Sequence, residues 1–140
     1  MARITLEYPE QVFTFTTSMT VRTGDINHGS HLGFDRLVSL LGHARFEYLA
    51  TLGIDEHSNP AIIVGDLAVV YKAESFRQDE LVFEVGVTDE NRYGGDIVYR
   101  VTRPADGAVV AVAKTGVVFL DTTTKRPTTP PESFGQQVAR

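Results

Sequence analysis

The chain of 140 residues is 42% hydrophobic and 22% charged, which matches one globular domain with a core of ordinary size. Its net charge of -5 and the scattering of its 13 basic residues exclude a basic stripe that could follow a nucleic-acid backbone. Because the chain has no cysteine, neither a disulfide framework nor a thiolate metal site is possible.

The amino-terminal segment carries no recognisable targeting signal. It begins MARITLEYPEQ, without a basic start followed by an apolar stretch. Nowhere does the chain approach the roughly 20 consecutive apolar residues that cross a bilayer. We therefore expect a cytoplasmic protein that has neither a membrane nor nucleic acid as a partner.

The first half of the chain predicts a strand, a turn and a long helix. Residues 12–22 are rich in β-branched and aromatic residues and contain no Gly or Pro, which is typical of a strand. The turn at 24–33 ends this strand. Apolar residues then recur through 34–52 with the 3.6-residue period of a helix, and Gly53 is well placed to stop it.

The second half predicts four further strands, at 61–73, 80–88, 96–103 and 108–120. Turn signals separate them, and their short connections favour an antiparallel meander. Residues 122–140 are so rich in Thr and Pro that we expect an ordered edge passage that fades into a partly flexible tail. Residues 1–140 thus form a single domain.

One helix and about five long antiparallel strands predict an α+β fold, in which a curved sheet wraps around the long central helix. A single sheet of this kind leaves its edge strands open. Pairing an edge with a second copy of the chain would remove that liability, so we expect a homodimer and leave open its further pairing into a homotetramer.

Polar side chains crowd into the turn directly before the helix: Asp25, Asn27, His28 and His31. A helix N-terminus offers unpaired backbone N–H groups and a positive dipole end, which suit a developing oxyanion. A simpler interpretation makes Asp25 and Asn27 turn and capping residues and His28 a solvated residue. His28 and His31 are three residues apart and have no clear third ligand, so they do not predict a metal site.

This order of elements and this turn resemble the hotdog-fold thioesterases, in particular the 4-hydroxybenzoyl-CoA thioesterase-like family. The family pattern is approximately D-x-D-x-x-G-H-V-N-N-x-x-Y, followed by E-A-R in the helix. The chain departs from it where the second acid, catalytic in some members, is Asn27, and where the Gly is Ser30, the Tyr is Leu37 and the helix acid is His43. The positions that fall in register are Asp25, Asn27, Ser30, His31, Leu32, Gly33, Leu37, Ala44 and Arg45.

The resemblance implies hydrolysis of an acyl-CoA or acyl-carrier-protein thioester by a positioned water, with no cofactor beyond the CoA of the substrate. Backbone N–H groups around Gly33 and Phe34 would bind the substrate and form the oxyanion hole. Asp25 would act as the base or orient Asn27, which would hold the water, and His31 would position it or shuttle a proton. An amide has no basic lone pair, so Asn27 is itself neither nucleophile nor base.

Three further polar residues, Arg45, Asp66 and His43, have structural or catalytic interpretations. Arg45 falls in the middle of the apolar arc of the helix, where it needs a partner carboxylate, and Asp66 is a candidate. Alternatively, Asp66 reaches the active site and supplies the carboxylate that Asn27 lacks. His43 can bind substrate, or it can pair with Glu47 on a solvated or dimer-facing helix face.

Two other functions remain open. GDINHGSH partly resembles the G-D-x-N-P-x-H turn of hotdog enoyl-CoA hydratases, and the missing acids also fit a non-catalytic protein that binds acyl thioesters. In each case the family implies an apolar acyl tunnel at the dimer interface. Candidates for contacts to the CoA phosphates are Arg36, Lys125 and Arg126.

Overall fold

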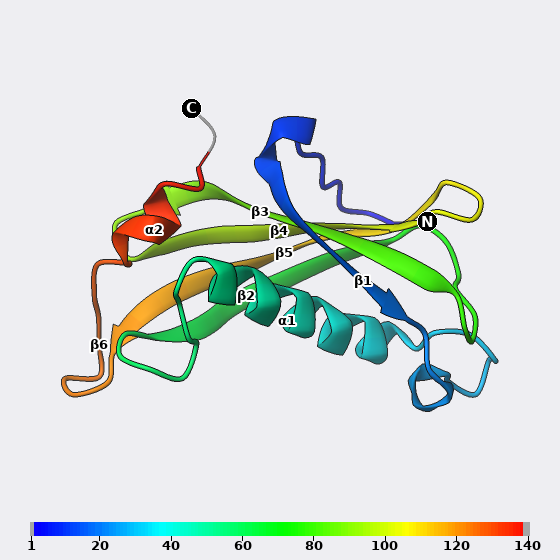
Figure 1. Ribbon diagram of the computed structural model, residues 1–140, viewed down its shortest axis with the longest axis horizontal. Coiled ribbons are helices and arrows are strands. Elements are labelled where there is room, and N and C mark those ends of the chain that lie inside the picture. The colour runs from blue at the N-terminus through cyan, green and yellow to red at the C-terminus, as the bar shows by residue number, and fades with distance from the viewer. Residues whose placement is uncertain (1, 139–140) are drawn as a thin grey trace.

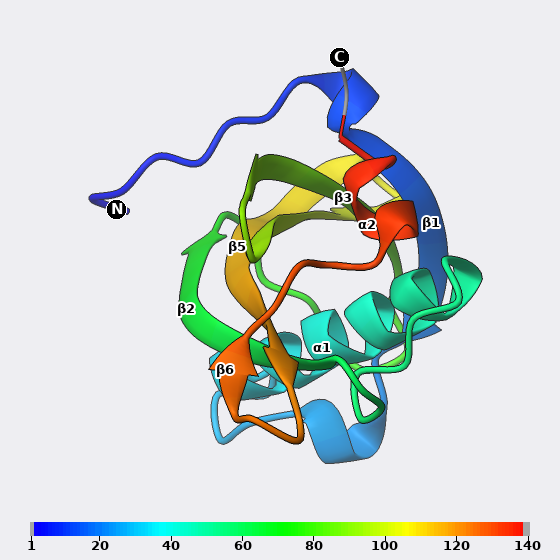
Figure 2. The same cartoon turned by 90° about the vertical axis from the view of Figure 1, so that its left-hand side faces the viewer.

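The structure is a computed structural model that describes residues 2–138. Its main elements are one long helix and a curled antiparallel sheet (Figures 1 and 2). Short 3-10 turns at Glu10–Val12 and Thr23–Asp25 flank the first strand. The elements are β1 (Phe13–Thr20), α1 (Phe34–Thr51), β2 (Ala61–Tyr71), β3 (Glu80–Asn91), β4 (Gly94–Arg103), β5 (Ala108–Asp121), β6 (Arg126–Pro127) and α2 (Glu132–Gly135).

The strand order is β1-β3-β4-β5-β2, with the two-residue β6 beside β5. The sheet curls so far that its edge strands β1 and β2 lie on opposite sides of α1 (Figure 2). The α+β hotdog architecture predicted from the sequence is therefore confirmed.

The predicted four-strand meander is wrong at its first step. Strands β3, β4 and β5 are consecutive neighbours, but β2 pairs with β5, and β1 takes the place beside β3. An extended chain covers about 3.3 Å per residue, so residues 72–79 are long enough to pass across the open end of a curled sheet. A short connection therefore does not require adjacent strands here.

The core lies between α1 and the concave face of the sheet. Helix α1 starts and ends within one residue of the predicted 34–52, and its buried face includes Leu37, Leu41 and Tyr48. Aromatic side chains of the sheet, among them Phe83 and Tyr99, are fully buried against it. Fully burying a large apolar side chain contributes about 1.5–3 kcal/mol, so this face fixes the position of α1 and of the turn before it.

Arg45 forms the structural ion pair that its place on α1 requires, but its partner is not Asp66. Its Nε donates to Glu56 Oε1 over 2.8 Å, and both side chains are more than four-fifths buried. Glu56 belongs to the loop after α1, which folds back over the helix. In the sequence Asp66 stood out because it lies within an apolar strand, but in the structure Glu56 is the acid beside Arg45.

The carboxyl-terminal segment is more structured than its composition suggests. It contributes β6 and α2, and Phe134 of α2 is fully buried with its ring centroid 5.0 Å from that of Phe119. A single apolar anchor in a run of Thr and Pro gives no periodic signal. Residues 139 and 140 of the expected tail lie outside the described residues.

No helix within residues 2–138 combines the length and apolar character needed to cross a membrane.

Candidate active site

The turn before α1 is itself a small closed hairpin. Ile26 and Leu32 form an isolated antiparallel bridge, and the Asn27 N–H donates to the His31 carbonyl over 2.9 Å. At the tip, Ser30 has φ of 68° and donates its N–H to the Asn27 carbonyl. This is the left-handed region that glycine adopts without strain, which explains the family Gly at this position.

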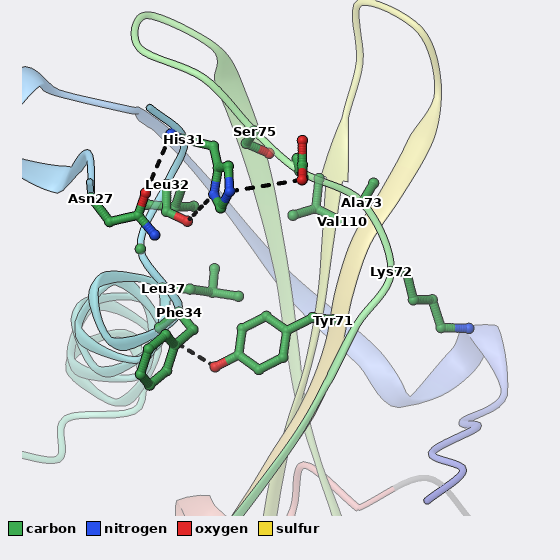
Figure 3. A pocket seen from close by; sticks show the side chains of 12 residues that line it. Asn27, His31, Leu32, Phe34, Leu37, Tyr71, Lys72, Ala73, Ser75 and Val110 are labelled. Carbon is green, nitrogen blue, oxygen red and sulfur yellow. Dashed lines mark hydrogen bonds and ion pairs between the residues drawn. The ribbon is translucent and has the colours of Figure 1, made fainter. Parts of the chain in front are cut away.

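The side chain of Asn27 is oriented by this hairpin. Its Oδ1 accepts hydrogen bonds from the N–H groups of Gly29, at 2.9 Å, and of His31, at 3.4 Å. Both donors are backbone amides, so the atom facing them must be the oxygen. The amide hydrogens on Nδ2 are left for a ligand in the pocket that Asn27 lines (Figure 3).

A pocket of about 430 Å³ opens between this turn, the start of α1 and the end of β2 (Figure 3). That volume is within the usual range for a small-molecule site. The turn and helix contribute predicted site residues, whereas the far wall comes from β5 and from the end of β2 and the connection after it. The lining residues are Asn27, His31, Leu32, Gly33, Phe34, Leu37, Tyr71, Lys72, Ala73, Glu74, Ser75 and Val110.

His31 is the titratable turn residue in this pocket, with 31% of its side chain exposed. Its Nδ1 lies 3.4 Å from the Leu32 carbonyl, which only accepts hydrogen bonds. That contact is favourable when Nδ1 carries the hydrogen, so the neutral ring presents the lone pair of Nε2 to its surroundings. His28 is exposed and is absent from the described pocket lining.

Of the two backbone N–H groups expected to form the oxyanion hole, those of Gly33 and Phe34, the structure leaves only the second for a substrate. The N–H of Gly33 donates to the Asp25 carbonyl over 3.0 Å, so it is already used. The following N–H groups, beginning with Phe34, belong to the first turn, where an α-helix has no internal acceptor. Within residues 2–138 no side chain caps this end. Phe34 is therefore the main candidate oxyanion donor, and Tyr71 holds its carbonyl with a 2.9 Å hydrogen bond.

Asp25 points away from this pocket. Its side chain is 4% exposed, and it accepts hydrogen bonds from the Arg22 backbone N–H, at 2.8 Å, and from the Arg22 guanidinium. Burial alone would raise the pKa of Asp25, but these hydrogen bonds and the Arg22 charge outweigh it and hold the pKa below its ordinary value. Asp25 has the environment of a structural carboxylate.

His43 lies with Asp25 in a separate cleft on the other side of the turn, which Arg36 also lines. Its Nε2 is 2.9 Å from Glu47 Oε1, so the pairing anticipated from their spacing is confirmed. Glu47 in turn accepts a hydrogen bond from the Thr17 hydroxyl. The structure does not bring His43 to the pocket that Asn27 and His31 line.

Asp66 is likewise away from that pocket. It sits at a β-bulge of β2 with 64% of its side chain exposed, where it pairs with Lys114 at 2.8 Å and accepts the Gly116 N–H. The hydrogen bond from Lys114 lowers the pKa of Asp66. Strand β6, which begins at Arg126 directly after Lys125, lies at the opposite end of the molecule from the start of α1 (Figure 1).

Sequence reasoning missed the far wall of the pocket, including Tyr71, Lys72, Glu74 and Ser75. These residues follow the turn by some forty positions and belong to no recognisable motif. The one signal that links them is the apolar strand that ends at Tyr71. Among residues 2–138 no cluster of three or more His, Asp or Glu side chains could hold a metal ion.

The sequence matches the family model of the thioesterase-like superfamily over residues 21–138. No curated protein sequence matches it significantly.

Solved structures share the fold at low sequence identity. A 1,4-dihydroxy-2-naphthoyl-CoA thioesterase from Synechocystis has a TM-score of 0.79 and 15% identity, covering 88% of this chain and 93% of that one. A Staphylococcus aureus protein solved in complex with CoA has a TM-score of 0.80 and 19% identity, covering 88% and 80%. A DHNA-CoA thioesterase from Staphylococcus aureus has a TM-score of 0.74 and 18% identity, covering 81% and 78%.

Proposed function

The chain belongs to the thioesterase-like superfamily, and from that premise we propose that it hydrolyses acyl-CoA thioesters in the pocket between the turn and β2. One observation carries the proposal. Asn27, His31 and Phe34, the first residue of α1, line the same pocket, whereas Asp25 lines a separate cleft. The CoA of the substrate is the one cofactor that this chemistry needs.

In the proposed reaction the Phe34 N–H and the Asn27 amide donate hydrogen bonds to the thioester carbonyl and to the attacking water. Nε2 of His31 accepts a proton from that water as its oxygen attacks the carbonyl carbon. Asp25 keeps the turn in place by accepting hydrogen bonds from Arg22, while its carbonyl holds the Gly33 N–H. The roles of base and water holder thus fall to side chains of the pocket itself.

We also propose that the pocket is completed by a second copy of the chain lying along β2. This strand is a sheet edge, and it exposes apolar side chains in a row, including Val64 at 43% and Leu67 at 45%. At its end Tyr71 is 46% exposed, and Phe34 across the pocket is 70% exposed. A partner strand would cover all of these side chains and pair the open backbone edge.

A charge on this edge tests the dimer. Leu67→Arg is expected to lower the mass measured by sedimentation to half that of wild type. Phe46→Arg, at a similarly exposed apolar position on α1, is expected to leave the mass unchanged. A wild-type chain that sediments as a monomer would contradict the proposal.

The activity is tested by following free thiol release from short, medium, long and aromatic acyl-CoA esters. The account predicts turnover of at least one class. Crotonyl-CoA belongs in the panel because a hydratase would consume its double bond without releasing thiol. Hydration alone, or binding without turnover of any ester or of an acyl-carrier protein, would overturn the hydrolase assignment.

A further inference from the structure

The pocket holds a carboxylate that the sequence pattern does not indicate. Family members with an acid at the position of Asn27 have their carboxylate on the turn, and here that position is an amide. Among the described residues that line the pocket, Glu74 is the one acid. It follows β2 and approaches the site from the side opposite the turn.

Glu74 faces the reactive atom of His31. Its Oε1 lies 3.7 Å from Nε2, the nitrogen left with the lone pair when Nδ1 donates to the Leu32 carbonyl. At that separation the two atoms form an ion pair once Nε2 is protonated, and a water can lie beside both before that. Such distances often shorten when substrate binds.

The backbone around Glu74 is firmly held, although its side chain is 66% exposed. The Leu32 N–H donates to the Ser75 carbonyl over 2.8 Å, which ties the turn directly to this connection. The mostly buried guanidinium of Arg103 donates to the Glu74 carbonyl and is itself fixed by Asp106 at 2.8 Å. The backbones that carry Glu74 and His31 are thus held beside each other, with the two side chains within ion-pairing distance.

We propose that Glu74 is the positioning residue for His31 and stabilises the imidazolium that forms during hydrolysis. The proposal rests on the hydrolase function above. As the water oxygen bonds to the carbonyl carbon, one water proton moves to Nε2, and the resulting positive charge lies beside the Glu74 carboxylate. The tetrahedral intermediate then breaks its C–S bond, the proton passes from Nε2 to the thiolate sulfur, and the free acid and the thiol leave.

Glu74→Gln tests this role because it removes the charge and keeps the shape. Measured on the ester that wild type cleaves fastest, kcat is expected to fall about tenfold while KM changes little, since only the charged state of His31 loses its partner. Glu74→Asp is expected to recover part of kcat. The matched control is Glu80→Gln, which removes the same charge from an exposed residue just after this connection and outside the pocket lining.

The double variant with His31→Asn decides whether the two residues act as a unit. If they do, adding Glu74→Gln to His31→Asn produces no further loss of kcat. An unchanged kcat in folded Glu74→Gln, or an equal loss in both backgrounds, would overturn the proposal while leaving the hydrolase function intact. A wild-type protein that releases no thiol from any ester would instead overturn both.

Discussion

The turn before α1 borders two clefts that contain similar residue types but use them differently. In the cleft on the side of β1, Asp25 is buried and bonded to Arg22, and His43 is paired with Glu47. In the pocket on the side of β2, Asn27, His31 and Phe34 line a space of about 430 Å³. The first arrangement stabilises the turn, and the second can act on a ligand.

The comparison teaches that adjacency in sequence does not assign polar residues to one site. Asp25 and Asn27 are two positions apart, yet the hairpin closed by Ile26 and Leu32 separates their side chains. The Asp25 carboxylate is buried and already accepts three hydrogen bonds from Arg22. Asn27 and His31 each use one side-chain atom to hold the turn, and the other polar atom of each side chain can act on a substrate.

His31→Asn should produce the largest effect on activity. It removes the proposed proton acceptor but keeps a polar side chain of similar reach, so kcat is expected to fall about 100-fold, which equals about 2.7 kcal/mol in the activation free energy. Thiol release at saturating acyl-CoA measures it. Denaturant unfolding should give nearly the wild-type free energy, and a matching loss of stability would mean that His31 is structural.

Asp25→Ala should lower the stability of the fold and leave kcat nearly unchanged. It removes a buried carboxylate and leaves the Arg22 backbone N–H and guanidinium without their acceptor, so the free energy of unfolding is expected to fall by about 2 kcal/mol. Urea denaturation followed by circular dichroism measures the change. In conditions where the variant is folded, kcat should remain close to that of wild type, and a collapse of kcat would restore Asp25 as a catalytic residue.

The stabilisation by Asp25 should also depend on pH. Because its pKa is lower in the folded state than its ordinary value of 3.8, its contribution is fully present above pH 3.8 and is lost as the pH falls through the folded pKa. The stability difference between wild type and Asp25→Asn should therefore shrink as the pH falls below 3.8. A difference that grows on acidification would show that the pKa is raised instead.

Gly29→Ala should have the smallest effect on kcat, and its structural effect should be confined to the pocket. A Cβ at Gly29 would lie 3.0 Å from His31 Nε2 and 3.4 Å from Asn27 Oδ1, so His31 must shift by a few tenths of an ångström. We expect kcat to fall about threefold with little change in stability, because misplacing a catalytic group costs rate. Gly24→Ala is the control, since nothing lies within 4 Å of its Cβ position.

The sequence predicts local structure well here because α1 and the strands carry strong periodic signals. It does not predict the partner of β2, since pairing in a curled sheet depends on how the whole sheet closes. The sequence singled out Asn27 and His31, which both line the candidate pocket, because a single short motif contains them. It did not single out Glu74 and Tyr71, because their approach to the turn depends on the Leu32–Ser75 hydrogen bond and on Arg103, which no local pattern encodes.

The most direct test of the account is an NMR titration with a ketone analogue of the preferred acyl-CoA, in which a methylene group replaces the thioester sulfur and the carbonyl is kept. The account predicts that the backbone amide proton of Phe34 moves downfield and that the other large changes fall in residues 27–33 and 71–75. Changes centred instead on Arg22, Asp25 and His43 would place the reaction in the other cleft and contradict the central claim.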